Sequence, residues 1–423
     1  MNTGTRITIL SALFIIATCL ASPAAATSLG IDWKQSPMLA DSLFSGIVMT
    51  PDGSTVFTGG SQLMVRNWDG PRWGGKAGFV AAMSPDGSYV ATCTDNTVTV
   101  LNRSGYEMWS RNMDGKVKAV AIAKGGEFVI TADDKGNYNA WTTNGEFIAR
   151  NQSAVVKRLA VSPTGNLVVA TTESGIRFYS ASLDPVWTDP RAGSLDDYIV
   201  ISDDGSTIIT AGGPRLSSHT AKGVRNWQVD VTDTAINDVA CTQDCSLVLV
   251  GSQDNTLKGI DRYGKTRWTY GTSQWVNAVG TSANGAVIAA GVNDGTVIVL
   301  DHRGRLQTEK KFDPRIQPRT LAVSPDGTRI AVADQHYLYG LSVYDADLTG
   351  ESEDTIYVTA STTLAPKTSV PTTVPTTMIL EVTMPEEARP TATTTKASPV
   401  GTYVILPGIA GALWLARKCC RKT

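Results

Sequence analysis

The sequence has little of what catalytic and nucleic-acid-binding proteins usually display. Of its 423 residues 3 are histidine and 6 are cysteine, and the formal net charge is −2. No long basic run lies between residues 29 and 345, so the basic stripe needed to bind nucleic acid is missing. The three histidines, His219, His302 and His336, lie far apart and beside no recognisable nucleophile or metal-ligand motif. We therefore expect each to be an exposed or edge residue rather than a catalytic base.

What the sequence has is a repeat of about forty residues. In its clearest copy the turn Ser84-Pro85-Asp86-Gly87 separates runs in which apolar and polar residues alternate, which indicates β-strands joined by a type I turn. The turn returns at spacings of 34 to 42 residues, at 50–53, 123–126, 162–165, 202–205, 242–245, 282–285 and 324–327. Tryptophan marks the final run of five copies, at Trp73, Trp109, Trp187, Trp227 and Trp268. Each copy predicts a four-stranded antiparallel sheet, with the tryptophan packed between sheets.

Eight such sheets in series are the sequence form of a β-propeller. The last repeat has three predicted strands, near 320–323, 329–333 and 337–344, and no fourth with the tryptophan mark. An unmatched copy of that strand, Gly30-Ile31-Asp32-Trp33, precedes the first turn. We therefore predict an all-β, eight-bladed propeller over residues 29–345, in which residues 29–36 complete the last blade and leave no open sheet edge. The competing closing strand is 354–360, DTIYVTA.

The first strand of each repeat reads as a short run of small apolar residues, such as 81–83, 120–122 and 159–161. These strands would surround the axis of the propeller. The pattern predicts a packed channel wall without a cofactor.

Residues 1–26 are expected to be an export signal. Arg6 lies in a short basic start, residues 7–20 form an apolar core, and Ala24-Ala25-Ala26 is a small-residue cleavage site. The mature chain would then begin at Thr27. The competing interpretation is lipidation of Cys19, for which the preceding Thr18 is a poor fit.

Export would place the propeller where disulfides form. Cys241 and Cys245 flank the turn Thr242-Gln243-Asp244, close enough in sequence for a disulfide to clamp the hairpin, and the alternative is two free thiols. Cys93 is expected to be a buried strand residue.

The composition changes beyond Asp345. Residues 359–399 include thirteen Thr and six Pro, which prevent a packed core, so 346–399 is expected to be a disordered, extended stalk. Residues 400–423 contain an apolar run, 402–416, followed by a basic cluster, 417–422. They are expected to be either a short transmembrane helix with a cytoplasmic basic tail or a segment cut by a sorting enzyme.

Three resemblances add to this interpretation. The closing strand Asp261-Arg262-Tyr263-Gly264-Lys265-Thr266-Arg267-Trp268 resembles the tryptophan-docking repeat of PQQ-like, quinoprotein-type propellers. The hairpin LAVSPDG at 321–327 is similar to WD-repeat and YVTN-type surface propellers. The stalk and basic end resemble C-terminal sorting signals of prokaryotic, especially archaeal, surface proteins, which implies an exported propeller anchored at the cell surface.

The resemblance to quinoproteins implies a possible cofactor, PQQ with calcium, often stacked on vicinal cysteines. The one adjacent pair here, Cys419-Cys420, lies outside the repeats. The prediction is therefore a monomeric, non-catalytic scaffold without cofactor or metal, bound to an unknown surface or envelope protein. The alternatives are a PQQ-like or other propeller enzyme and a ligand sensor.

The resemblance to other propellers places the partner surface on the face that carries the turns between second and third strands and the loops between blades. The candidate residues there are Asp95, Asp133, Asp134, Glu173, Asp254, Trp275, Asp294, Arg315 and Asp334. The competing interpretation is that the acidic residues only satisfy the backbone angles of tight turns.

Overall fold

The computed structural model describes residues 27–36, 44–60, 64–74, 80–123, 126–190, 198–313 and 315–344. The expected export signal, the stalk, the C-terminal segment and the alternative strand 354–360 lie outside these residues. In the described part of the chain, no helix has the length and hydropathy to cross a membrane.

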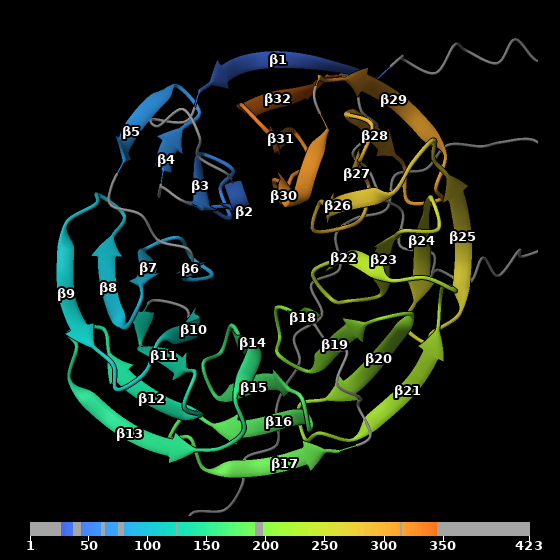
Figure 1. Ribbon diagram of the computed structural model, residues 1–423. Coiled ribbons are helices and arrows are strands. Elements are labelled where there is room, and N and C mark those ends of the chain that lie inside the picture. The colour runs from blue at the N-terminus through green and yellow to red at the C-terminus, as the bar shows by residue number, and fades with distance from the viewer. Residues whose placement is uncertain are drawn as a thin grey trace, which may run out of the picture. The chain divides into compact units, whose positions relative to one another are not determined.

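The described residues form eight four-stranded antiparallel sheets around a central axis, with the first strand of each blade nearest the axis (Figure 1). The strands of the first four blades are β2 (Phe44–Met49), β3 (Thr55–Gly60), β4 (Met64–Asn67) and β5 (Gly70–Gly74); β6 (Val80–Met83), β7 (Tyr89–Thr94), β8 (Thr97–Asn102) and β9 (Glu107–Asn112); β10 (Val117–Ile122), β11 (Phe128–Asp133), β12 (Asn137–Thr142) and β13 (Phe147–Gln152); β14 (Val156–Val161), β15 (Leu167–Thr172), β16 (Gly175–Ser180) and β17 (Pro185–Asp189).

The fifth to seventh blades repeat the same order. Their strands are β18 (Tyr198–Ile201), β19 (Thr207–Gly212), β20 (Arg215–Thr220) and β21 (Arg225–Asp230); β22 (Ile236–Cys241), β23 (Leu247–Ser252), β24 (Thr256–Asp261) and β25 (Thr266–Gly271); β26 (Val276–Thr281), β27 (Ile288–Val292), β28 (Thr296–Leu300) and β29 (Leu306–Lys311).

The eighth blade closes the ring as the sequence predicts. It consists of β30 (Ile316–Val323), β31 (Arg329–Asp334), β32 (Leu338–Tyr344) and the N-terminal strand β1 (Ser28–Gln35). β1 pairs antiparallel with β32 from Ser28 opposite Tyr344 to Gln35 opposite Leu338. Figure 1 shows β1 at the rim of the eighth blade, next to the first. The prediction of an all-β, eight-bladed propeller closed by an N-terminal strand is confirmed.

Tryptophan packing joins successive blades, as the sequence indicates. The indole N–H of three closing-strand tryptophans donates to a carbonyl in the next blade's last turn: Trp109 to Thr143 (2.8 Å), Trp227 to Arg262 (2.7 Å) and Trp268 to His302 (3.0 Å). Each indole also lies over the glycine of that turn. A Cβ at Gly264, for example, would come within 2.8 Å of Trp227, and its φ of 82° also favours glycine. These contacts are inter-blade packing, not ligand stacking.

A polar ladder links the blades closer to the axis. Asn237 Nδ2 donates to the carbonyl of Val276 in the seventh blade (3.2 Å), and Asn277 Nδ2 donates to that of Ile316 in the eighth (2.9 Å). Each asparagine is the second residue of its inner strand, where a β-bulge turns it toward the next blade. The sixth and seventh blades are therefore joined both at the rim, through Trp268, and near the axis, through Asn237.

Candidate functional site

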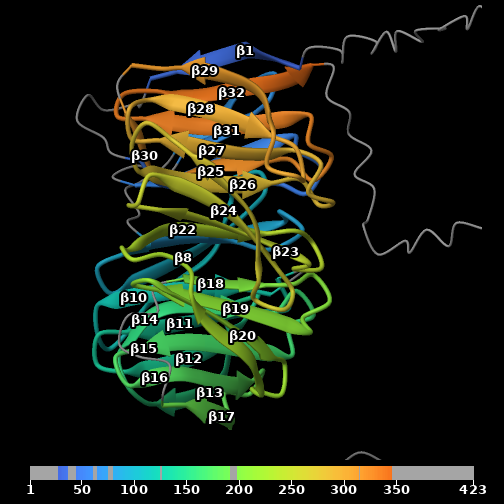
Figure 2. The ribbon, with the colours of Figure 1, turned by 90° about the vertical axis from the view of Figure 1, so that its right-hand side faces the viewer.

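The propeller has two faces, which we name by what they carry. The first-turn face carries the turns between the first and second strands, and the loop face carries the turns between second and third strands together with the loops between blades. Backbone hydrogen bonds hold the elements of the loop face together, for example from Met113 N–H to Asn96 (2.7 Å) and from Thr272 N–H to Asn255 (2.8 Å). Figure 2 views the ring edge-on, with the strands running from one face toward the other.

All nine residues proposed from the sequence lie on the loop face, but they differ in what their side chains do. The exposed ones are Asp95, Asp134, Glu173, Trp275 and Arg315. The other four, Asp133, Asp254, Asp294 and Asp334, are engaged in their own turns.

Asp133 and Asp334 are buried, with relative exposures of 1% and 0%. Asp133 accepts hydrogen bonds from the backbone and the side chain of Asn137, at 2.9 and 2.8 Å. Asp334 accepts from the backbone of His336 (2.6 Å) and from the hydroxyl of Tyr339 (2.8 Å). Because these carboxylates are enclosed, their role in the structure is to fix the turns.

Asp254 and Asp294 each carry a lysine partner. Lys258 Nζ lies 2.8 Å from Asp254 Oδ2, and Lys311 Nζ lies 2.8 Å from Asp294 Oδ2. Burial raises the pKa of Asp254, but hydrogen bonds, led by the one from Lys258, outweigh burial and hold it well below its usual range. The net charge that these two carboxylates present on the loop face is therefore small.

Among the described residues of the loop face, Trp275 is the largest exposed side chain. Its relative exposure is 47%, although its carbonyl accepts a hydrogen bond from the N–H of Asn293 in the turn between β27 and β28 (2.8 Å). Arg315 is exposed on the following loop between blades. Trp and Arg are two of the residue types that most often anchor a protein interface, and here both are exposed on the same face of the propeller.

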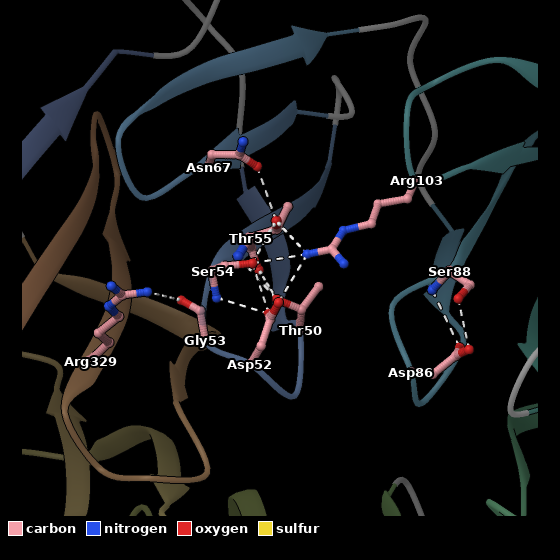
Figure 3. Close-up of polar contacts among 10 residues, drawn as sticks. All are labelled: Thr50, Asp52, Gly53, Ser54, Thr55, Asn67, Asp86, Ser88, Arg103 and Arg329. Atoms are coloured by element: carbon pink, nitrogen blue, oxygen red, sulfur yellow. Dashed lines mark hydrogen bonds and ion pairs between the residues drawn. The ribbon is translucent and has the colours of Figure 1, made fainter.

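The first-turn face is built by repeated turn chemistry. In seven of the eight turns, 50–53 among them, a Ser or Thr hydroxyl at the first position accepts the N–H of the residue five positions later. At Asp52 the turn is also tied to two other blades: Arg103 Nη2 lies 3.1 Å from Asp52 Oδ2, and Arg329 donates to the carbonyl of Gly53 at 3.0 Å (Figure 3). These turns surround a cavity of about 1180 Å³ at the mouth of the channel, lined by Asp52, Asp86, Asp204, Asp244, Arg262 and Arg267 among others.

Cys241 and Cys245 are joined by a disulfide across the sixth first turn, with Cα atoms 5.0 Å apart. Cys245 occupies the fourth position of the turn with a φ of 51°, where the other copies carry glycine. Cys93 is a free, buried thiol on β7, as expected, and burial raises its pKa to about 12.

The expectation that all three histidines are exposed or edge residues is wrong for His219. This side chain is fully buried on β20, and its Nε2 lies 3.4 Å from Asp189 Oδ2 in the preceding blade. Phe178 and Trp187 pack against its ring, with centroids 5.9 and 6.0 Å away. The sequence does not reveal this burial because the enclosing groups come from the neighbouring blade.

The prediction of an apolar, packed channel wall is also wrong. A cavity of about 470 Å³ lies in the channel, and its lining includes Lys118, Arg158, Arg319 and Asp238. All four precede the small apolar residues of their inner strands. Sequence reasoning missed them because it considered the apolar part of each run. The sequence feature that predicts charged side chains in the channel is a charged residue four or five positions before the first turn of these repeats.

No group of three or more His, Cys, Asp or Glu side chains suited to holding a metal ion is found within the described ranges. Three segments, residues 74–102, 226–261 and 264–301, match the family model described as WD domain, G-beta repeat. No curated protein matches the sequence. The described residues form an eight-bladed β-propeller, and three of its segments are similar to WD40 repeats. Propellers of this kind commonly act as protein-interaction scaffolds and are usually non-catalytic.

Proposed function

We propose that this chain is a non-catalytic scaffold at the cell surface that binds an envelope protein through the loop face of its propeller. The observation that carries the proposal is Trp275, an indole with 47% relative exposure on a backbone that is hydrogen-bonded to the turn between β27 and β28. Exposing an indole to water is unfavourable, and burying it against a partner would recover that cost.

The surroundings of Trp275 suit a protein partner. Asp294 and Lys311 neutralise each other in the same blade (2.8 Å), and Ser273 donates to Asp294 at 2.6 Å. Arg315 adds one exposed cation. A partner surface with an apolar pocket for the indole and a nearby carboxylate for Arg315 would complement this region.

The proposed location rests on the sequence. Export by residues 1–26, display on the stalk 346–399 and retention by residues 400–423 would place the propeller outside the cell membrane. N-terminal sequencing of the mature chain tests the first step: we expect a start at Thr27, and a lipidated start at Cys19 would contradict it. Protease added to intact cells tests the second step, because it should release the propeller without lysis.

A photo-crosslinking amino acid at position 275 tests the partner surface. The matched control carries it at position 263, because Tyr263 is more exposed, at 78%, and lies in a turn at the rim. We expect position 275, in intact cells, to yield one envelope protein that position 263 does not, and Trp275→Ala to weaken binding of that purified protein at least about tenfold. Equal adducts at both positions, or undiminished binding by Trp275→Ala, would contradict the proposed surface.

A further inference from the structure

The channel cavity brings together positive charge from three separate blades. Lys118 comes from β10, Arg158 from β14 and Arg319 from β30, and all three line the same cavity of about 470 Å³. The whole chain carries a formal net charge of −2, so this local excess of cations is not a general property of the protein. Like charges in a confined, partly desolvated space repel one another, which favours a bound anion.

Arg319 is held inside the channel by two features. Its φ is 61°, a left-handed conformation that is uncommon for a non-glycine residue, and it lies in the irregular segment where the pairing of β30 jumps from Ile316 to Leu321. Its guanidinium lies 4.3 Å from the ring centroid of Tyr198. Because Arg319 belongs to the eighth blade and Tyr198 to the fifth, the side chain reaches across the channel. Strain of this kind is frequently found at ligand sites.

Asp238 is the one acidic side chain among the described residues that line the cavity. It accepts a hydrogen bond from the backbone N–H of Val279 (2.9 Å), and burial raises its pKa to about 7, although that bond and one from Val239 lower it. Near neutral pH it is therefore only partly ionised. Lys118, Arg158 and Arg319 are the other charged groups among the described lining residues, so the net charge of this part of the lining is positive.

We propose that the central channel binds a small anion that carries phosphate or carboxylate groups, through Lys118, Arg158 and Arg319. The planar guanidinium groups can each donate two parallel hydrogen bonds to one phosphate or carboxylate, and the ammonium group adds a point charge. A cavity of about 470 Å³ is within the range of small-molecule sites. This site is independent of the loop face and of the proposed scaffold role.

Isothermal titration calorimetry of the full chain tests the site, with pyrophosphate as the phosphoryl probe and citrate as the carboxylate probe at constant ionic strength. Lys118→Gln and Arg319→Gln remove one cation each, and Lys222→Gln is the control, because Lys222 is exposed in an outer turn. We expect each channel variant to weaken the binding of the preferred probe about tenfold or more and the control to leave it unchanged. Preference for one probe identifies the anion class.

The proposal is overturned if the wild type binds neither probe, or if Lys118→Gln and Lys222→Gln bind equally well. Circular dichroism establishes that each variant folds. If Arg319→Gln does not fold, Lys118→Gln decides alone, because Lys118 is exposed in the channel and its loss removes little packing.

A second measurement uses sulfate, which remains a dianion between pH 6 and pH 8. Ionisation of Asp238 adds negative charge to the cavity, so the affinity of the wild type for sulfate should fall as the pH rises through about 7. Asp238→Asn should remove this pH dependence. A flat profile in the wild type, or an unchanged one in Asp238→Asn, would overturn the assignment of the site to this cavity.

Discussion

Replacing Trp33 with alanine should strongly destabilise the propeller, because this residue holds the strand that closes the ring. Trp33 lies on β1 with 8% relative exposure. Its indole packs on Gly340 of β32, where an added Cβ would lie 2.1 Å from the ring. Trp68 of the first blade meets it edge-on at 5.4 Å, and the guanidinium of Arg66 lies 4.3 Å from its centroid.

The magnitude follows from these contacts. Truncating a buried tryptophan to alanine costs about 3 to 5 kcal/mol. The aromatic pair and the cation–π contact each add about 0.5 to 1.5 kcal/mol. Part of this energy is already included in the cost of truncation. We expect Trp33→Ala to lower the free energy of unfolding by about 4 to 6 kcal/mol. Trp33→Phe should cost far less, because the indole Nε1 of Trp33 makes no hydrogen bond and only part of the ring is lost.

Urea denaturation followed by circular dichroism measures the loss, with Trp275→Ala as the matched control. Because Trp275 is 47% exposed, its truncation should cost under about 1 kcal/mol. Hydrogen exchange should also show faster exchange in β1 and β32 of Trp33→Ala than in the other blades. Equal losses for the two tryptophans, or unchanged exchange in β1, would refute closure by packing of Trp33.

Three further predictions concern charged groups. Burial lowers the pKa of His219 more than Asp189 raises it, so the unfolded chain binds more protons, and the stability of the wild type should be full above about pH 6.5 and fall below it. In thermal melts His219→Gln should lack this fall at low pH, and a parallel pH profile of wild type and variant would contradict the argument. The pH dependence from Asp238 has the opposite sign, because its raised pKa makes the folded chain bind more protons than the unfolded chain between about pH 4 and 7. Asp238→Asn should therefore be more stable than wild type at pH 8, by at most about 4 kcal/mol. A gain in stability at pH 4 instead would contradict the argument. The ion pair of Arg103 with Asp52 is exposed, so a double-mutant cycle should give a coupling below about 1 kcal/mol that shrinks with added salt, whereas a larger, salt-independent coupling would disagree.

The architecture could be predicted because its signals are local. The turn at 84–87 needs Pro, Asp and Gly at fixed positions whatever surrounds it, and the structure has the bond from Gly87 N–H to Ser84 at 2.8 Å. The tryptophans recur once per blade, and this recurrence alone predicts that Trp227 packs between blades. The last repeat has three strands and the N-terminal strand with Trp33 has no partners of its own, so the two together complete the eighth blade and leave no sheet edge open.

The candidate site could be predicted only in part, because exposure depends on neighbours from other blades. Asp95 and Asp133 both begin turns between second and third strands, yet Asp95 is exposed and Asp133 is enclosed by its hydrogen bonds to Asn137. The sequence pattern is nearly the same for both. The packing around each turn decides which carboxylate a partner can reach.

The sequence by itself determined the number of blades, the turns and the ring closure, because backbone angles and apolar alternation act over a few residues and repeat. The tertiary structure alone decided that Arg319 reaches Tyr198 across the channel and that His219 meets Asp189 between blades. Both contacts join residues about 30 or more positions apart. These residues come close together only because eight sheets close around one axis, and no local pattern in the chain encodes that closeness.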